Sequence, residues 1–354
     1  MRIAVTGASG NLGTSVLAAL RDDPAVEEII GIARRRPPRE ERKVRWVSAD
    51  VAADDLVTAF TGADVVIHLA WLIQPSRNLR ATWSSNVLGS ERVFQAAAEA
   101  DVSALIYASS VGAYSPGPKD HAVGESWPTD GVATSTYSRE KAYVERILDA
   151  FEMRHPQLRV VRLRPGFVLK RAAASGIRRL FAGPWLPTRL LSSHFIPVVP
   201  RLPQLRFQTV HSLDVGQAFR LAALRSEAHG AFNVAAEPPL GPDELAALFH
   251  ARTVPVPAGL LRALAAFAWH ARLVPTEPGM VDLLFAVPLM DTTRARDELG
   301  WRPAHSAVDA LREVIDGMRK GAGADTPPLQ PTPGITGRLS ELRTGVGARD
   351  RRDR

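Results

Sequence analysis

A glycine-rich segment near the start of the chain is the feature that most constrains the fold. The apolar run at 2–6 is typical of a strand, the pattern at 11–21 is typical of a helix, and the sequence TGASGNLG joins them. Its glycines Gly7, Gly10 and Gly13 allow a tight turn, close approach of a pyrophosphate to the backbone, and close helix packing. The start of that helix offers free N–H groups and positive potential to a diphosphate. The segment therefore predicts a dinucleotide site.

Strand-like apolar runs alternate with helical patterns over most of the chain. The expected strands lie at about 2–6, 27–33, 44–48, 64–69, 103–109, 158–163 and 231–235. The expected helices lie at about 11–21, 53–60, 79–99, 137–153 and 212–225. This alternation predicts an α/β protein with a parallel sheet covered by helices on both faces. Right-handed crossovers then give a doubly wound, Rossmann-like strand order.

Shifts in composition divide the chain into regions. Residues 1–165 are expected to form a dinucleotide-binding Rossmann domain, completed by a strand and a helix at about 207–236. Residues 166–206 and 237–320 are expected to form a smaller, mostly helical substrate-binding region. Residues 321–354 are rich in Gly, Pro and Arg without periodicity, which predicts a disordered tail.

One helical pattern in the second region carries an apolar stripe through Leu260, Leu264, Phe267 and Ala271. A core-facing helix is the ordinary explanation for such a stripe. The alternatives are an apolar wall of a substrate pocket and a contact with a membrane surface made by residues 255–290.

Composition excludes several classes of protein. The 354 residues include no cysteine, so disulfides, thiolate metal sites and a cysteine nucleophile are excluded, and the nine scattered histidines predict no metal site. The net charge of +7 is mixed with acids and forms no long stripe, so nucleic-acid binding is not expected. No signal peptide is expected before the first strand, and the apolar runs are too short for a membrane span of ~20 residues. A cytoplasmic location is therefore expected.

The end of the second expected strand indicates which dinucleotide binds. An Asp or Glu there would bind the ribose hydroxyls of NAD, whereas an Arg accommodates the 2′-phosphate of NADP. Here Ala33 is followed by Arg34, Arg35 and Arg36, with no acid. Because a guanidinium pairs well with a phosphate, the sequence favours NADP(H) over NAD(H). A solvated basic loop is the other explanation.

Tyr137 and Lys141 are four residues apart at the start of an expected helix, so they share one helix face. A cation beside a phenol favours the phenolate and lowers its pKa toward working pH. Alone, the spacing is more often that of a partly exposed helix face. A dinucleotide site upstream makes a catalytic pair the stronger interpretation.

Taken in order, these motifs resemble those of the extended short-chain dehydrogenase/reductase family, also called the NAD-dependent epimerase/dehydratase family. The resemblance covers most of residues 1–320. Besides the glycines, it is carried by Asp50-Val51, His68-Leu69-Ala70, Asn86-Val87-Leu88-Gly89-Ser90, Ser109-Ser110, Arg164-Pro165-Gly166-Phe167-Val168, Val210-His211-Ser212-Leu213-Asp214-Val215, Asp291-Thr292-Thr293-Arg294-Ala295 and Leu299-Gly300-Trp301. Two departures stand out: Ala33 replaces the acid of NAD-using members, and 166–205 shows no nucleotide-sugar pattern.

The resemblance implies hydride transfer between a nicotinamide and a secondary alcohol or ketone. Tyr137 would be the general acid/base, Lys141 would lower its pKa and hold the nicotinamide ribose, and Ser110 would orient the substrate oxygen. The implied cofactor contacts are Gly7, Ser9, Gly10, Asn11, Leu12, Gly13, Arg34, Arg35, Asp50, Val51, Leu69, Ala70, Asn86, Tyr137, Lys141, Pro165 and Val168. His68 is better explained as a packed core histidine than as a base.

Other functions remain open at this point. A nucleotide-sugar epimerase or dehydratase would keep its cofactor bound and recycle it, and a non-catalytic dinucleotide sensor or scaffold would need no Ser110, Tyr137 and Lys141 set. The expected partner is a small molecule. Apolar residues dominate the expected pocket walls at 71–80, 166–205 and 255–290, which favours a hydrophobic or modestly polar substrate. The resemblance also implies that the helices at 79–99 and 137–153 could form a homodimer contact, as in family relatives.

Overall fold

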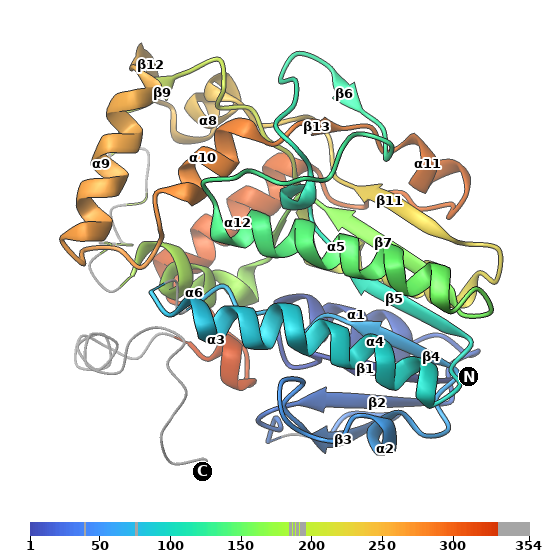
Figure 1. Cartoon of the computed structure of the whole chain (residues 1–354). Coiled ribbons are helices and arrows are strands. Elements are labelled where there is room, and N and C mark those ends of the chain that lie inside the picture. The colour runs from blue at the N-terminus through green and yellow to red at the C-terminus, as the bar shows by residue number, and fades with distance from the viewer. Residues whose placement is uncertain are drawn as a thin grey trace.

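A parallel sheet forms the centre of the molecule (Figure 1). The computed structural model describes residues 1–38, 40–74, 77–183, 186, 188, 191 and 196–331. The seven strands of the sheet are β1 (Arg2–Thr6), β2 (Glu28–Ala33), β3 (Val44–Ser48), β4 (Val65–His68), β5 (Ala104–Ala108), β7 (Arg159–Pro165) and β11 (Gly230–Val234). Their order is β3-β2-β1-β4-β5-β7-β11, with every neighbouring pair parallel. The predicted doubly wound sheet is confirmed, and its strands are the seven expected from the sequence.

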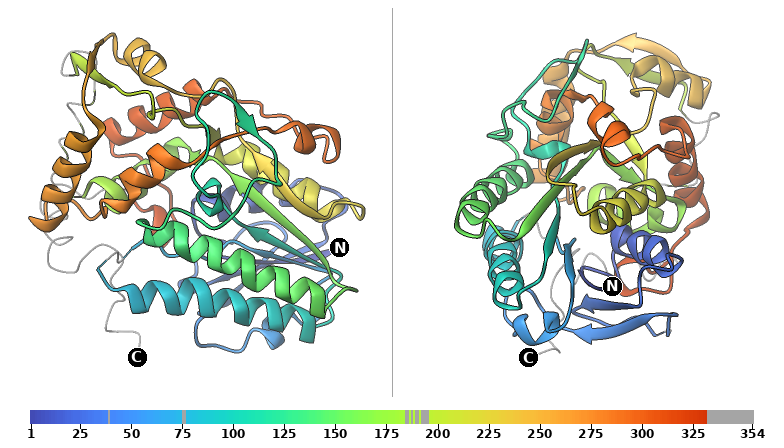
Figure 2. Two further views of the ribbon diagram at one scale, coloured as in Figure 1. Left: turned by 45° about the horizontal axis from the view of Figure 1, so that its top comes forward. Right: turned by 90° about the vertical axis from the view of Figure 1, so that its right-hand side faces the viewer.

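Apolar runs form these strands because both faces of the sheet are covered. Every residue of β4 and β5 is buried, as expected for central parallel strands. Helices α1 (Asn11–Arg21) and α7 (Ser212–Leu224) cover one face; α4 (Gly89–Glu99) and α5 (Thr136–Arg154) cover the other. The right-hand view of Figure 2 shows the two layers on either side of the sheet.

The predicted helices at 53–60 and 79–99 differ in detail from those observed. The first is only α2 (Val57–Phe60), because the Asp55 carboxylate accepts hydrogen bonds from the N–H groups of Val57 and Thr58 and starts the helix there. The second is divided into α3 (Leu79–Trp83), a π-helical turn at Ser84–Leu88, and α4. A π turn widens the helix and rotates the residues that follow it.

The rest of the described chain lies over the carboxyl edge of the sheet. Its helices are α6 (Ala174–Ile177), α8 (Pro242–Phe249), α9 (Ala258–His270), α10 (Gly279–Ala286), α11 (Thr293–Asp297) and α12 (Ala307–Lys320). Short strands pair as β8 (Phe167–Leu169) with β10 (Thr209–His211), β9 (Val198–Arg201) with β12 (Arg252–Pro255), and β6 (Ala122–Val123) with β13 (Leu289–Met290). Shorter turns are the 3-10 helices at Val111–Ala113, Arg171–Ala173 and Pro327–Leu329 and a π turn at Arg178–Ala182.

The prediction of a disordered tail from residue 321 is wrong for residues 321–331. Leu329 is buried, the N–H of Ser175 donates to the carbonyl of Ala322 (3.1 Å), and a guanidinium N–H of Arg179 donates to the carbonyl of Gln330 (2.8 Å). Composition alone missed this packing, because backbone carbonyls act as the acceptors whatever the side chain. Residues 332–354 of that prediction lie outside the described residues.

No described helix has the length and apolar character needed to cross a membrane. No group of three or more His, Asp or Glu side chains within the described ranges is arranged to hold a metal ion.

Candidate active site

The glycine-rich turn joins β1 to α1 at the carboxyl edge of the sheet. Gly7 has a φ of 69°, in the left-handed region that favours glycine. A Cβ on Gly7 would lie 2.8 Å from the amide nitrogen of Ala70, and one on Gly13 would lie 2.3 Å from the carbonyl oxygen of Gly7. Both atoms belong to the backbone and cannot give way, so the turn requires glycine at these two positions.

The first turn of α1 presents backbone N–H groups that no side chain caps. Only the Gly7 carbonyl lies within 4 Å of the place where a Cβ on Gly10 would stand, so a ligand can approach the backbone there. The Asn11 side chain donates to the carbonyl of Val168 (3.2 Å), while its own buried oxygen has no hydrogen-bond partner among the described residues. An uncapped helix start and an unpaired acceptor fit the diphosphate and hydroxyl groups of a dinucleotide. Ser9 and Leu12 lie in the same turn.

The ends of β2 and β3 border this turn. Ala33 closes β2 and is buried, whereas Arg34 and Arg35 follow it on the exposed side. After β3, an Asp50 carboxylate oxygen accepts from the Ala52 N–H (3.0 Å) and fixes the turn. Val51 is buried, and its side chain lies 2.9 Å from where a Cβ on the first residue of α4 would stand. Two exposed arginines therefore follow β2, the strand whose end neighbours the adenosine ribose in a Rossmann fold.

The segment after β4 is tied to β1. The N–H groups of Leu69 and Ala70 both donate to the Thr6 hydroxyl, at 3.2 and 3.4 Å. His68 is buried between the hydroxyls of Thr6 (2.7 Å) and Ser90 (2.9 Å). Burial, with a smaller contribution from the Lys141 charge, lowers the pKa of His68 to about 3. A neutral, fully bonded imidazole matches the expected core histidine.

Ser110 and Tyr137 are brought together at the carboxyl end of β5. The Ser110 hydroxyl accepts a hydrogen bond from the Gly112 N–H (3.0 Å), which starts a 3-10 turn. A Cβ on Gly112 would lie 2.8 Å from a ring carbon of Tyr137, so glycine lets the ring pack against the turn. Burial raises the pKa of Tyr137, and its hydrogen bond with Ser110 acts in the opposite direction.

Lys141 lies beneath this pair and is buried. Its ammonium donates to the carbonyl of Ala108 (2.7 Å) and to the hydroxyl of Tyr107 (3.4 Å). The face of the Trp71 ring covers it at 3.4 Å. Burial lowers the pKa of Lys141 well below its usual range, while the charges of Glu145 and Glu140 act in the opposite direction. The ammonium therefore has acceptors on three sides.

A buried ionic network supports the serine turn from below. The Ser109 hydroxyl donates to one carboxylate oxygen of Glu145 (2.5 Å), and guanidinium groups of Arg162 and Arg164 donate to the same carboxylate at 3.0 Å. Burial alone would raise the pKa of Glu145, but Arg164 and then Arg162 lower it to about 2. Arg164 also donates to the Tyr114 hydroxyl (3.0 Å), which anchors the far end of the turn.

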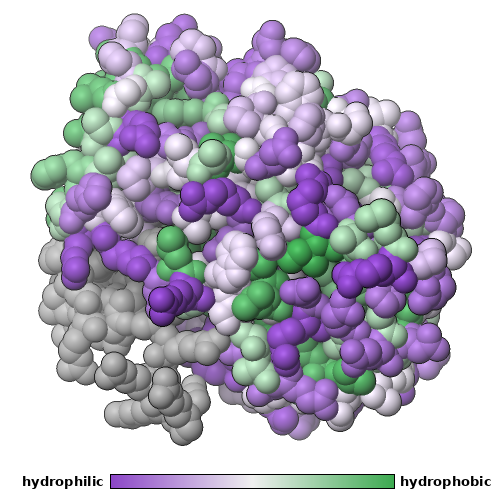
Figure 3. Space-filling model, in the orientation of Figure 1, coloured by the Kyte–Doolittle hydropathy of each residue, from purple (hydrophilic) through white to green (hydrophobic). Residues whose placement is uncertain are grey.

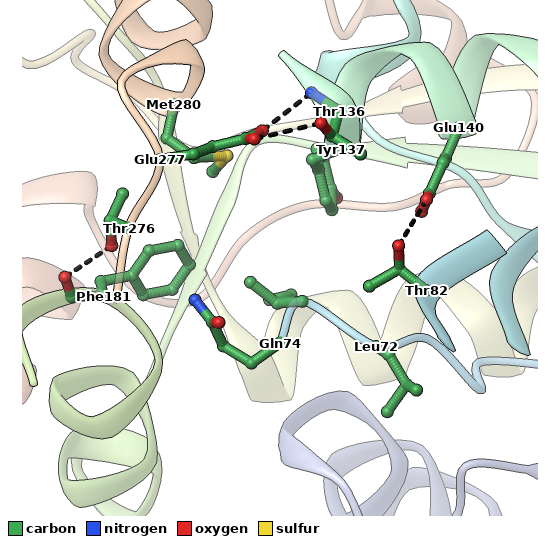
Figure 4. A pocket seen from close by; sticks show the side chains of 11 residues that line it. Leu72, Gln74, Thr82, Thr136, Tyr137, Glu140, Phe181, Thr276, Glu277 and Met280 are labelled. Carbon is green, nitrogen blue, oxygen red and sulfur yellow. Dashed lines mark hydrogen bonds between the residues drawn. The ribbon is translucent and has the colours of Figure 1, made fainter. Parts of the chain in front are cut away.

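A pocket opens beside the Tyr137 ring (Figure 4). It is lined by Leu72, Ile73, Gln74, Thr82, Thr136, Tyr137, Glu140, Phe181, Thr276, Glu277 and Met280. The wall mixes apolar side chains with two carboxylates. The side chains around the pocket therefore offer both apolar contacts and hydrogen-bonding groups.

Glu140 is the buried carboxylate of this wall. The Thr82 hydroxyl and the Asn86 side-chain amide each donate to it at 2.7 Å. The Asn86 amide also donates to the Leu72 carbonyl (2.8 Å) and accepts from the Leu72 N–H (2.7 Å). Burial raises the pKa of Glu140, and these two donors act against that shift. Asn86, expected to contact the cofactor, is fully buried, and its side chain makes these hydrogen bonds.

Glu277 connects the second wall of the pocket to the catalytic helix. Its carboxylate accepts from the N–H (2.8 Å) and the hydroxyl (3.0 Å) of Thr136, in the first turn of α5. The chain then packs so closely that a Cβ on Gly279 would stand 2.1 Å from the carbonyl oxygen of Thr134. The start of α10 is therefore packed against the residues that lead into α5.

Three residues of this site were not singled out from the sequence. Glu140 lies three residues after Tyr137, so its place on the same helix face could have been inferred. Trp71 and Glu277 fall within the expected wall segments 71–80 and 255–290, but their roles depend on contacts with distant parts of the chain. Pro165 and Val168, which were expected, lie at the end of β7 and in β8, where Val168 meets Asn11.

Comparisons with known proteins support this description. The sequence model of the NAD dependent epimerase/dehydratase family matches residues 3–235. An uncharacterised protein of Mycobacterium tuberculosis is 29% identical over 325 residues, which are 91% of this chain and 31% of the relative. The chain thus spans about a third of the length of the first curated relatives that it matches.

Two further proteins have assigned activities. L-arabinose 1-dehydrogenase (NAD(P)(+)) of Haloferax volcanii is 38% identical over 109 residues, which are 30% of this chain and 40% of that enzyme. The structure of UDP-glucose 4-epimerase from Thermus thermophilus in complex with NAD superposes with a TM-score of 0.64. That comparison covers 90% of this chain and 99% of the epimerase at 19% identity, and it shows a shared fold.

Proposed function

Because the chain belongs to the NAD dependent epimerase/dehydratase family, we propose that it is an NAD(P)-dependent oxidoreductase acting on a secondary alcohol or ketone. The observation that carries the proposal is the packing of Tyr137 against the Ser110 turn at the edge of a pocket, with Lys141 beneath. When bound, the nicotinamide supplies or accepts the hydride. Gly10, Asn11 and the start of α1 would hold its diphosphate.

Tyr137 is the proton donor or acceptor at the substrate oxygen in this proposal. Because burial raises its pKa, the phenol carries its proton at neutral pH, which suits donation to a ketone oxygen. The Ser110 hydroxyl, fixed by Gly112, would hydrogen-bond the same oxygen and orient it. The Lys141 ammonium favours the phenolate that forms after the proton has left.

NADP(H) is the proposed cofactor in preference to NAD(H). Support comes from the end of β2, where a buried Ala33 precedes the exposed Arg34 and Arg35. A carboxylate would repel a 2′-phosphate, whereas these guanidinium groups can pair with it. The dehydrogenase of Haloferax volcanii, which matches 30% of this chain, has NAD(P)(+) in its name.

A homodimer is proposed through α3, the π turn and α5. Trp83 and Tyr143 contact each other with ring centroids 5.0 Å apart, yet they are 38% and 50% exposed. Leu79 and Leu88 extend this apolar surface, and both are nearly half exposed. Green residues gather over α4 and α5 in Figure 3. A self-complementary surface of this kind suits two-fold pairing.

The function is tested by following reduced nicotinamide with a panel of ketones and nucleotide sugars, in the wild type and in Tyr137→Phe. Loss of the phenolic proton is expected to lower turnover by roughly 100-fold or more, with NADPH affinity retained. Full turnover in Tyr137→Phe would overturn the assignment of Tyr137. Conversion of a nucleotide sugar without net change in reduced nicotinamide would instead favour an epimerase that recycles its cofactor.

A further inference from the structure

We propose that α9 and the paired strands β9 and β12 form a surface that docks on an anionic lipid bilayer. The apolar part of this surface, the α9 patch, consists of Val198, Val254, Leu260, Leu264, Phe267 and Leu273. Phe267 is 67% exposed and Leu264 is 55% exposed. Figure 3 shows green residues along the upper left edge of the molecule, where Figure 1 places α9.

The helix itself indicates that this surface has a partner. No residue of α9 is buried within the described structure. Leu260, Leu264 and Phe267 recur at the spacing of a single helix face, and this face points away from the protein. A helix of 13 residues gains little stability from its own hydrogen bonds and depends on covering its apolar face. The core-facing interpretation of this stripe, the ordinary one from the sequence, is therefore wrong.

The charges around the α9 patch select the kind of partner. Arg262 forms an ion pair with Asp282 (2.8 Å), and Arg201 forms one with Asp243 (2.9 Å). The charges of these two arginines are therefore neutralised by their partners. No such pairing is found, within the described residues, for the other basic groups of this rim, which are Arg77, Arg252 and Arg272. The stretch 245–276 contains no Asp or Glu. The rim of the α9 patch is therefore positively charged.

The Arg77 guanidinium adds to this charge at the end of α9. It stacks on the Trp269 ring at 4.1 Å and donates to the Trp269 carbonyl. Burial lowers the pKa of Arg77, and the nearby charge of Arg272 lowers it further. Two cations therefore lie close together at the end of α9. Basic groups around an apolar helix face are the pattern of a helix that lies in the interface of an anionic membrane.

A second copy of the chain is a poorer occupant of the α9 patch. A two-fold contact would bring the same surface of each subunit together and set Arg252 and Arg272 near their own copies. Like charges that face each other at an interface oppose association. Anionic headgroups would instead attract the same guanidinium groups.

Docking would place the pocket close to the bilayer. The chain leaves α9 through the exposed Leu273 and reaches Thr276 and Glu277, which line the pocket. The Gln74 side chain donates to the carbonyl of Pro275 (3.0 Å) and holds this connection against the pocket wall. The α9 patch and the pocket therefore share one short segment of chain.

The test is co-sedimentation of the full chain with phosphatidylglycerol-containing vesicles and with pure phosphatidylcholine vesicles. The wild type is expected to bind the anionic vesicles and to be released by high salt. A double variant, Leu264→Ser with Phe267→Ser, loses two apolar side chains that would insert into the bilayer. Its affinity for the anionic vesicles is expected to fall by roughly tenfold or more. Leu213→Ser, which changes an exposed leucine on α7, away from the α9 patch, is the control.

Circular dichroism establishes that the double variant is folded, as expected for changes at exposed positions. Wild-type protein that ignores anionic vesicles would overturn the proposal. Binding that persists in the folded double variant would also overturn it, since another surface would then be responsible. If the double variant instead changes only the molecular mass in solution, the α9 patch contacts a second copy and the lipid proposal fails.

Discussion

The ammonium of Lys141 lies 3.4 Å from the centre of the Trp71 ring, directly over its face. Its other partners are the Ala108 carbonyl at 2.7 Å and the more distant Tyr107 hydroxyl. A desolvated cation on a tryptophan face is stabilised by about 2 kcal/mol. Trp71 also lies edge-on to the Tyr137 ring, with centroids 5.9 Å apart. One indole therefore contacts both residues proposed for catalysis.

Replacing Trp71 with leucine is expected to lower turnover by roughly tenfold or more, since the cation–π contact offsets part of the cost of burying the Lys141 charge. Trp71→Phe is the matched variant, because phenylalanine keeps a ring face, and its loss should be smaller. Steady-state kinetics over a range of pH provide the measurement. Equal turnover in Trp71→Leu and wild type would show that the ring does not matter to Lys141.

Arg34 and Arg35 are expected to select NADPH. The double variant Arg34→Ala with Arg35→Ala should weaken NADPH binding by roughly 10- to 100-fold, the value of charge-assisted hydrogen bonds to a phosphate. Binding of NADH should change little, because that cofactor lacks the 2′-phosphate. Fluorescence titration with both cofactors measures the two affinities. A parallel loss for NADH and NADPH would mean that the arginines do not discriminate between them.

The helices of the proposed dimer offer a third test. Tyr143→Asp places a charge in the apolar surface around Trp83, and it is expected to convert the protein to a species with the 38.4 kDa mass of one chain. Sedimentation equilibrium of variant and wild type compares the masses. Leu213→Asp, on α7, introduces the same charge elsewhere and should leave the assembly unchanged. A wild type that is already monomeric at micromolar concentration would contradict the proposal.

The fold could be predicted from the sequence because each strand of a buried parallel sheet is a continuous run of apolar residues. Strands such as β4 and β5 are continuous apolar runs, and Gly7 and Gly13 mark a turn where a Cβ meets backbone. Local patterns of this kind depend on neighbouring residues alone. The Tyr137 and Lys141 pair was predicted in the same way, from its spacing on a helix, whereas Ser110 was inferred only from the family resemblance.

The wall segments 71–80, 166–205 and 255–290 were expected from the sequence, but the contacts that build the walls were not accessible in this way. Glu277 reaches Thr136 across 141 residues, and Trp71 meets Lys141 only after the sheet has formed. Residues 321–331 looked disordered because their contacts use backbone carbonyls, which composition does not record. Contacts between distant parts of the chain and hydrogen bonds to backbone carbonyls therefore could not be predicted from the sequence.

Two substitutions of Glu140 should separate the effect of its charge on stability from the effect of its hydrogen bonds. Glu140→Gln keeps a side chain of the same shape that can bond with Thr82 and Asn86, so it should fold with nearly wild-type stability. Glu140→Leu leaves these buried groups unpaired, which is expected to cost about 2 kcal/mol. Urea unfolding of the three proteins provides the comparison. Equal stability of the glutamine and leucine variants would show that the cluster is not held by these bonds.

The acid sensitivity of the fold is expected to depend on His68. Its pKa is about 3 in the folded protein, below the value near 6.5 for an unfolded chain, because the imidazole is buried. The folded state therefore favours the neutral ring, whose stabilising contribution is complete above about pH 6.5 and is lost as the pH falls toward 3. Over that range the unfolded chain binds a proton that the folded chain does not.

This linkage predicts the result of replacing the ring. His68→Gln loses bonds with Thr6 and Ser90, so it should be less stable than wild type at neutral pH. The gap should narrow by about 1.4 kcal/mol for each pH unit below about 6.5, since only the wild type has this histidine to protonate on unfolding. Urea unfolding between about pH 7 and pH 4 measures the gap. A constant difference across that interval would show that His68 is protonated equally in both states.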